Sequence, residues 1–282
     1  MDKQEQAEFL IEALPCIKKY RGKTIVIKYG GNAMTDDGLK AAVMSDVTVL
    51  SELGMKVVLV HGGGPDISDI SKKMGIEPRF VNGLRYTDKQ TAEIALMALS
   101  GKVNKTLVDL IESKGGKAIG LCGLDGHMLI CGKQSEELGY VGKINSINTK
   151  VITDVLNIGY IPVISPVGCD GEGNIYNINA DTAAAAIAGA LEAEVLLLMT
   201  DIRGLLENKD DPESLIKEVY VSDIPALVKQ GIISGGMIPK IECCKEAIRR
   251  GGKTVFITDG RVYHSILVEI LSEEGSGTMF YS

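Results

Sequence analysis

The sequence predicts an α/β fold in which helices cover both faces of a mainly parallel central sheet, forming a three-layer αβα sandwich. Short apolar runs rich in β-branched residues alternate with helical patterns along the 282 residues. The runs lie at residues 24–28, 56–60, 117–121, 161–165, 195–199 and 254–258. Nearly unbroken apolar strands are typical of strands buried on both faces. Repetition of strand, turn and helix favours parallel pairing.

The segments between these runs carry helix start signals. Thr87 and Gln90 match a capping box ahead of an apolar-periodic stretch that extends to about Ile111. Asp181 precedes the small-residue run TAAAAIAGA. Residues 124–150 and 168–180 are rich in Gly, Asn and Asp. They are expected to form hairpins or loops beside a cleft.

An amphipathic helix is expected over residues 3–20, ahead of the first strand. Apolar residues recur there at helical spacing, and charged residues occupy the other face. The apolar residues are Phe9, Leu10, Ala13, Leu14 and Ile17. We therefore divide the chain into an N-terminal helix, residues 1–20, and one large domain, residues 21–282.

Composition indicates a soluble, globular, cytoplasmic protein. Apolar residues make up 45% of the chain and charged residues 24%, which suffices for a large core. We find neither an apolar run long enough to span a bilayer nor a signal-peptide pattern. Six scattered cysteines without a C-x-x-C pair predict reduced thiols rather than a zinc site. The net charge of −7, with no basic cluster among aromatics, argues against nucleic acid as a partner.

The strongest local signal is LVHGGGPD, in which strand 56–60 runs into Gly62, Gly63 and Gly64. Consecutive glycines allow backbone N–H groups to converge at a helix N-terminus, which makes an anion-binding nest. A tight strand-to-helix turn without a ligand is the alternative. Ile67 replaces the third glycine of a dinucleotide-binding fingerprint, and no Walker motif occurs. Dinucleotide enzymes and P-loop NTPases are therefore disfavoured.

Two lysines accompany glycine pairs. Lys28 ends the first strand beside Gly30 and Gly31, at the sheet edge where ligands bind in open parallel sheets. Lys240 follows Gly236 in the segment SGGMIPK, in the first turn of a helix, where the macrodipole disfavours a cation. For Lys28 the alternative is an ordinary solvated charge. For Lys240 the alternative is a chance placement without function. An anionic ligand would explain both.

Two further segments offer polar side chains. In YNINAD, Asn177, Asn179 and Asp181 alternate, so an extended chain would point them to one side. Asp181 could simply be the N-cap of the next helix, or it could orient two lysines or hold Mg²⁺ indirectly. Arg85, in NGLRYTD, supplies a two-pronged donor suited to a carboxylate, although arginine is also common on surfaces.

Taken together and in this order, IKYGG, VHGGGPD, NGLRYTD, YNINAD, LLMTDIRGLL and GGMIPK closely resemble the N-acetylglutamate kinases of the amino-acid kinase family. The resemblance covers nearly the whole chain. Carbamate, aspartate and uridylate kinases share the glycine turns but not NGLR together with NINAD. The resemblance implies the amino-acid kinase fold. It also implies phosphorylation of the side-chain carboxylate of N-acetyl-L-glutamate to N-acetyl-L-glutamyl 5-phosphate by ATP with Mg²⁺, in arginine biosynthesis.

The resemblance implies roles for individual residues. Lys28 and Lys240 would stabilise the transferring phosphoryl group, and Asp181 would hold both lysines. Arg85 would bind the α-carboxylate of acetylglutamate, and Asn177 its acetylamino portion. The residues expected to contact the substrate are Gly63, Gly64, Arg85 and Asn177. Those expected to contact phosphate are Gly30, Gly31 and Gly62. Those expected to contact ATP are Asp201, Gly204, Ser234 and Gly236. Residues 21–175 would bind acetylglutamate and residues 176–282 ATP, with no residue assigned as a direct metal ligand.

This chemistry needs no general base. A carboxylate with a pKa near ~4 is already ionised at neutral pH. The difficulty is repulsion between an anionic nucleophile and the γ-phosphate, which lysines, Mg²⁺ and backbone nests address.

Both ends of the chain resemble the arginine-inhibited subgroup of these kinases, whose N-terminal helices join dimers into a hexameric ring. L-Arginine would then be an inhibitor and the chain a homo-oligomer, a trimer of dimers. The candidate arginine contacts are Tyr20, His264, Glu269, Glu274 and Gly277. The alternative is a helix packed on its own subunit.

Two other functions stay open. The chain could phosphorylate a different acid, or it could be a catalytically silent arginine-sensing module. Lys28, Lys240 and Asp181 argue against the module, because it would have no evident use for two lysines converging on phosphate.

Overall fold

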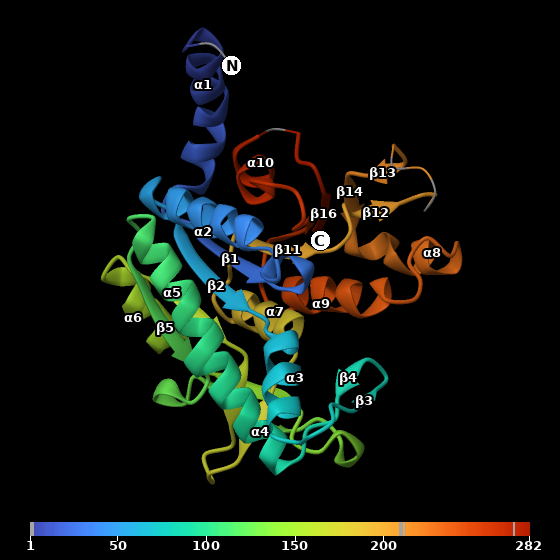
Figure 1. The fold of residues 1–282 in the computed structure, drawn as a ribbon. Coiled ribbons are helices and arrows are strands. Elements are labelled where there is room, and N and C mark those ends of the chain that lie inside the picture. Colours follow the sequence, from blue (N-terminus) through green and yellow to red (C-terminus); the bar gives the residue numbers. More distant parts are fainter. Residues whose placement is uncertain (1–2, 209–210, 212, 273) are drawn as a thin grey trace.

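The computed structural model describes residues 3–208, 211, 213–272 and 274–282, without the side chains of residues 3–7, 9 and 32. Its main sheet has eight strands in the order β14-β16-β15-β11-β1-β2-β8-β5 (Figure 1). The central strands match the expected runs: β1 Thr24–Tyr29, β2 Lys56–His61, β5 Ala118–Cys122, β8 Ile161–Ser165, β11 Val195–Thr200 and β15 Thr254–Asp259. These strands pair in parallel, which confirms the predicted class. At one edge, β16 (Thr278–Tyr281) runs antiparallel to β15, and β14 (Glu218–Tyr220) pairs with β16.

Helices cover both faces of this sheet, as predicted. One face carries α2 (Asp37–Glu52), α5 (Asn104–Ser113) and α10 (Ser265–Leu271), and the other carries α6 (Thr149–Asn157), α7 (Ala180–Ala190) and α9 (Met237–Arg249). Alternate residues of β1 serve the two cores: Ile25 and Ile27 pack on the α2 side, and Val26 on the α7 side. Five of the seven alanines of α7 are buried, so this helix packs closely against the middle of the sheet.

The expected long helix near residues 87–111 is interrupted. It consists of α4 (Lys89–Leu96), a π-helical segment at Met97–Val103, and α5. The predicted capping box is wrong, because Asp88 is the N-cap and accepts from the Thr91 amide at 2.7 Å. Thr87 instead donates its hydroxyl to the Arg85 carbonyl at 3.0 Å. Asp and Thr are both good N-caps, so the pattern alone could not choose between neighbours.

A second, four-stranded sheet in the order β10-β9-β6-β7 confirms the hairpins expected at residues 124–150 and 168–180. β6 (Leu129–Lys133) pairs antiparallel with β7 (Gly142–Ile147), and β9 (Val167–Cys169) with β10 (Ile175–Asn177). The smaller elements are α3 Gly64–Lys73, β3 Phe80–Val81, β4 Leu84–Arg85, β12 Leu205–Leu206, β13 Leu215–Ile216 and α8 Ile224–Lys229.

The predicted N-terminal helix is α1 (Lys3–Tyr20), which projects from the body of the molecule (Figure 1). Its C-terminal part packs on the rest of the chain and buries Ala13 and Tyr20. Leu10 and Leu14 of the predicted apolar stripe are 66% and 45% exposed, and the Phe9 side chain lies outside the described residues. Across the described chain, no helix combines the length and apolarity that crossing a membrane would require.

Candidate active site

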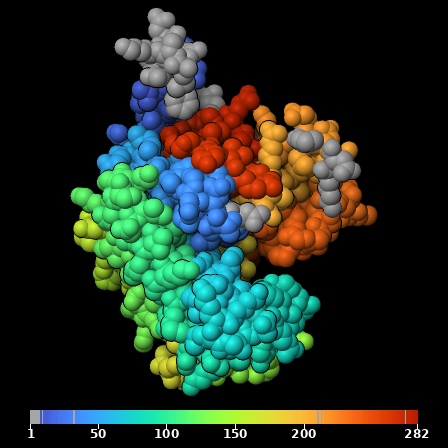
Figure 2. Space-filling view, in the orientation of Figure 1, coloured from blue at the N-terminus to red at the C-terminus, as the bar shows by residue number. Residues whose placement is uncertain are grey.

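A cavity of about 310 Å³ lies at the carboxyl ends of β1 and β2. The β1, β2 and β10 ends, the start of α3 and the β3–β4 hairpin contribute its walls. It brings together these predicted residues: Lys28, Gly30, Gly31, Gly62, Gly63, Gly64, Arg85 and Asn177. The surface is hollowed between the part around α3 and β3–β4 (cyan) and the part around α8 and α9 (orange) (Figure 2). The site therefore forms where the carboxyl ends of parallel strands meet, as expected for this class of sheet.

Glycine leaves room for neighbouring side chains at two positions of the wall. Gly63 has a φ of +150°, and a Cβ there would lie 2.5 Å from Leu99 Cδ2, in the π-helical segment. At Gly30 a Cβ would lie 2.8 Å from Lys28 Nζ. The missing side chains thus allow the π-helical segment to approach the nest and the Lys28 side chain to fold across the first glycine turn.

Asp181 joins the two predicted lysines. Lys28 Nζ lies 2.9 Å from Asp181 Oδ1, and Lys240 Nζ lies 3.9 Å from Asp181 Oδ2. The side chain of Lys28 is 9% exposed and that of Asp181 17%. Burial is the largest influence on the pKa of Asp181 and opposes its ionisation, but Lys28 and Lys240 together hold that pKa below its usual value. The carboxylate is therefore charged and keeps both ammonium groups beside the cavity.

Asp181 is available for this role because Asn179 is the N-cap of α7. The Asn179 side chain accepts from the Thr182 amide at 3.1 Å. The polar residues of YNINAD thus have different places: Asn177 and Asn179 both line the cavity, Asn179 also caps the helix, and Asp181 lies in the first helical turn.

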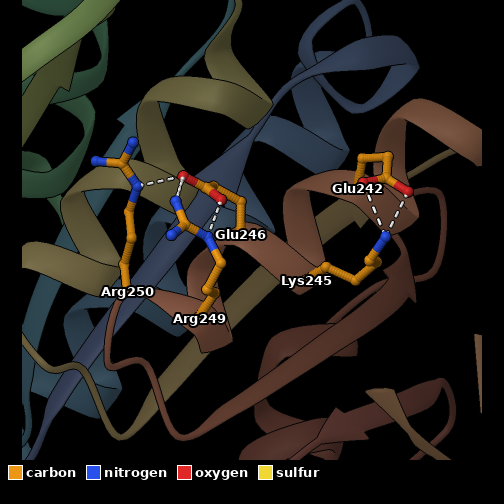
Figure 3. A network of polar contacts seen from close by, with 5 residues as sticks. All are labelled: Glu242, Lys245, Glu246, Arg249 and Arg250. Carbon is orange, nitrogen blue, oxygen red and sulfur yellow. Dashed lines mark hydrogen bonds and ion pairs between the residues drawn. The ribbon is translucent and has the colours of Figure 1, made fainter. Parts of the chain in front are cut away.

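Lys240 lies in the first turn of α9, which confirms its expected position. The exposed face of that helix carries its own ion pairs (Figure 3). Glu246 accepts from Arg249 at 2.8 Å and from Arg250 at 2.6 Å, and hydrogen bonding by Arg249 is the main reason why the pKa of Glu246 falls to about 2. Such pairs stabilise a helix by only a few tenths of a kcal/mol each. Lys240 is not part of this network and lies beside Asp181.

Arg85 is buried in the wall formed by the β3–β4 hairpin. Its Nη2 donates to the Gly64 carbonyl and to Ser68 Oγ, both at 2.8 Å, and its guanidinium lies 4.9 Å from the centre of the Phe80 ring. Its Nη1 is buried and has no hydrogen-bond partner among the described residues. A buried guanidinium N–H without a partner costs free energy, so this atom is suited to an anionic ligand.

Asn177 is linked to Arg85 through Thr87. Asn177 Nδ2 donates to Thr87 Oγ1 at 3.3 Å, and Thr87 donates to the Arg85 carbonyl. Sequence reasoning missed Thr87 and Ser68 in this network. Ser68 lies one helical turn beyond Gly64. That spacing was the signal from which its place in the network could have been predicted.

The four residues expected to contact ATP lie outside this cavity. Asp201 and Gly204 follow β11, and Ser234 and Gly236 precede or cap the start of α9. A Cβ at Gly204 would lie 2.5 Å from Thr278 Oγ1, so close packing is one reason for glycine there. Their contacts with a nucleotide stay a prediction.

A second cavity, of about 580 Å³, lies between α1 and the C-terminal segment. Four predicted arginine contacts line it: Tyr20, Glu269, Glu274 and Gly277. Glu269 accepts from the backbone amides of Ser276 and Gly277, both at 3.0 Å, yet burial raises its pKa. Lys217 also lines the cavity and pairs with Glu274 at 3.1 Å. Sequence reasoning missed this lysine.

His264 is not part of the lining of the second cavity. Its Nδ1 lies 2.6 Å from Oδ1 of Asp46 in α2. The predicted contact of His264 with arginine therefore has no support from this geometry.

Comparison with known proteins agrees with the site. Residues 23–259 match the model of the amino acid kinase family. An acetylglutamate kinase of Brachyspira hyodysenteriae is 51% identical over 280 residues, covering 99% of this chain and 97% of that protein. One of Clostridioides difficile is 53% identical over 276 residues, covering 98% and 96%.

Solved structures agree on the fold. The N-acetylglutamate synthase of Neisseria gonorrhoeae, complexed with coenzyme A and N-acetyl-glutamate, superposes with a TM-score of 0.84 at 24% identity; the match covers 98% of this chain and 63% of the synthase. The carbamate kinase of Giardia lamblia bound to AMP-PNP gives 0.69 at 20% identity, covering 93% and 99%. At these identities the likeness shows the fold alone. From the family match and the full-length relatives, this chain belongs to the amino-acid kinase family, within its group of acetylglutamate kinases.

Proposed function

We propose that this chain transfers the γ-phosphoryl group of ATP to the side-chain carboxylate of N-acetyl-L-glutamate. The products are ADP and N-acetyl-L-glutamyl 5-phosphate, an intermediate of arginine biosynthesis, made in the cytoplasm. One observation carries the proposal: Lys28, paired with Asp181, lines the same cavity as Arg85, whose buried Nη1 has no hydrogen-bond partner among the described residues. The cavity thus offers one cationic group for a phosphoryl group and another for a carboxylate that does not react.

Acetylglutamate binds over the N-terminal half, residues 21–175, with Asn177 just beyond it. Arg85 Nη1 donates to the α-carboxylate, and Asn177 contacts the acetylamino portion. The side-chain carboxylate then extends toward Lys28 and the glycine turns. Acetylation matters because it removes the positive charge of the α-amino group. The described lining of the cavity has no carboxylate that could bind such a charge. The nearby carboxylate of Asp181 is already paired with the two lysines.

Transfer relies on charge stabilisation. The acceptor carboxylate is ionised at neutral pH, so no residue has to remove a proton. Lys28 and Lys240 neutralise charge on the phosphoryl oxygens, while the Gly31 and Gly63 N–H groups donate to them. Asp181 orients both lysines. Because its carboxylate is paired with both ammonium groups, it also lowers the electrostatic cost of bringing two cations to one site.

ATP binds over residues 176–282, against Asp201, Gly204, Ser234 and Gly236. Mg²⁺ would be bound through the nucleotide phosphates. Within the described residues, no group of three or more His, Cys, Asp or Glu side chains is arranged to hold a metal ion. Mg²⁺ commonly binds through substrate phosphates, water and one or two carboxylates. When bound, it would neutralise charge between the β- and γ-phosphates.

The second cavity is proposed to bind L-arginine as a feedback inhibitor. Glu269 and Glu274 supply carboxylates for a cationic ligand, and Lys19 and Lys217 supply cations for its α-carboxylate. The exposed Leu10 and Leu14 on α1 would be covered by the same helix of a neighbouring dimer, giving a hexamer. Arginine bound beside α1 would then favour one ring geometry in which the catalytic cleft is held open.

A coupled ADP-release assay tests the function. N-Acetylglutamate, glutamate, aspartate and carbamate are compared as acceptors at saturating MgATP. We expect turnover with N-acetylglutamate to exceed turnover with the other three. Equal or better turnover with unacetylated glutamate would refute the substrate assignment and favour another member of the amino-acid kinase family.

A further inference from the structure

A buried polar relay lies directly behind the glycine nest. His61, the last residue of β2, is fully buried, and its Nδ1 lies 2.7 Å from the Gly62 carbonyl oxygen. Its Nε2 lies 3.2 Å from Nδ2 of Asn104, which is 1% exposed and begins α5 after the π-helical segment. None of these side chains lines the cavity of about 310 Å³, yet the relay ends on a peptide that does.

The hydrogen-bond partners determine the direction of this relay. Asn104 Nδ2 also donates to the Val163 carbonyl at 2.8 Å. A carbonyl oxygen only accepts, so the amide nitrogen must face it, and the amide cannot be flipped. His61 Nε2 must therefore accept from Asn104, which leaves Nδ1 as the N–H donor to Gly62.

His61 is neutral at physiological pH. Burial is the main influence and lowers its pKa to about 4, while Lys105 lowers it further and the Gly62 carbonyl and Asp66 oppose the change. A neutral imidazole has one donor and one acceptor nitrogen, as this arrangement requires. Gly120 makes room for the relay, since a Cβ there would lie 1.8 Å from Asn104 Oδ1.

The Gly62 carbonyl that accepts from His61 lies in the same peptide plane as the Gly63 amide. In a trans peptide the C=O and N–H groups point in opposite directions. With the Gly62 oxygen drawn toward the buried imidazole, the Gly63 N–H points away from it. A glycine-rich turn could otherwise rotate this peptide at little steric cost.

We propose that His61 and Asn104 are positioning residues that hold the Gly62–Gly63 peptide with its N–H directed at the transferring phosphoryl group. Neither residue touches substrate. The relay acts through the backbone donor, and this role rests on the phosphoryl transfer proposed above. A preorganised donor stabilises developing charge without having to reorient during the reaction.

A matched pair of substitutions separates the two nitrogens of His61. In His61→Asn the amide nitrogen is as many bonds from the backbone as Nδ1, so it can still donate to Gly62. In His61→Gln the amide reaches the position of Nε2 and keeps the Asn104 contact, but it leaves the Gly62 carbonyl without its donor. We expect His61→Gln to lower kcat by about tenfold or more, less than the full loss of an oxyanion donor, with little change in KM. His61→Asn keeps the donor to Gly62 but loses the acceptor for Asn104, so its kcat should lie between that of the wild type and that of His61→Gln.

Ser100→Ala is the control. It removes a polar contact of the preceding π-helical segment, the 2.7 Å hydrogen bond between Ser100 and Ser165, without touching the nest. Its kcat should equal that of the wild type. A His61→Gln enzyme as active as the wild type would overturn the proposal, as would equal impairment of His61→Asn and His61→Gln.

The tautomer can be measured without catalysis. Long-range ¹⁵N–¹H correlation spectra of the histidine-labelled wild-type protein should show His61 protonated at Nδ1 and bare at Nε2. The opposite tautomer, or a charged ring at pH 7, would overturn the relay. If the wild type fails to phosphorylate N-acetylglutamate while the tautomer is as expected, the proposed function fails and the relay geometry stands.

Discussion

Replacing Arg85 with alanine should raise KM for acetylglutamate while leaving kcat nearly unchanged. Arg85 Nη2 is already engaged by Gly64 and Ser68, whereas Nη1 is buried without a partner among the described residues, so a ligand carboxylate would complete its hydrogen bonding. A hydrogen bond to a charged group is worth about 1.5–3 kcal/mol, which corresponds to a KM about 10- to 150-fold higher. The α-carboxylate does not react, so its binding energy is equal in ground state and transition state.

The assay is coupled ADP release at saturating MgATP with varied acetylglutamate. Ser68→Ala is the matched variant, because it removes one of the two Nη2 contacts and leaves Nη1 in place. It should raise KM less, by about 2- to 10-fold, which corresponds to about 0.5–1.5 kcal/mol. An unchanged KM in Arg85→Ala, or a loss confined to kcat, would refute the substrate orientation.

The other predictions concern the lysines, the buried histidine and the N-terminal helix. Lys28→Ala and Lys240→Ala should each lower kcat by about 10²-fold or more while circular dichroism shows an intact fold, and an effect on KM alone would contradict their role. As pH falls from 6.5 to 4, the unfolding free energy of the wild type should decrease by up to about 3 kcal/mol more than that of His61→Gln. The reason is that His61 gains a proton in the unfolded chain but resists protonation in the folded chain. Urea unfolding curves of the two proteins that shift equally with pH would contradict this. Leu10→Glu combined with Leu14→Glu should give active dimers insensitive to arginine, and light scattering that still shows hexamers would refute the assembly.

Much of the sheet could be predicted because its strands are buried on both faces. Runs such as 24–28 and 195–199 are almost wholly apolar, and their parallel pairing follows from the intervening helices. The edge strand β14 and its neighbour β16 escaped prediction. They are only three and four residues long, and buried residues alternate with exposed ones in β14 and with partly buried ones in β16, so they lack the unbroken apolar pattern of the central strands.

The site was predictable where glycine, lysine and arginine carry local signals, as at Gly63 and Lys28. What the sequence could not provide is set by tertiary contacts. Asn104 looks like any polar residue within a helix, and only the fold brings it to the His61 ring and the Val163 carbonyl. The π-helical segment could not be predicted either, because its apolar spacing resembles that of an ordinary α-helix.

The most direct test of the account is acyl phosphate formation. The wild-type protein is incubated with MgATP, N-acetylglutamate and hydroxylamine, and the acyl hydroxamate is quantified beside ADP, with glutamate in a parallel reaction. The account predicts one hydroxamate for each ADP with N-acetylglutamate and little of either product with glutamate. ADP release without hydroxamate, or hydroxamate formed equally well from glutamate, would contradict it.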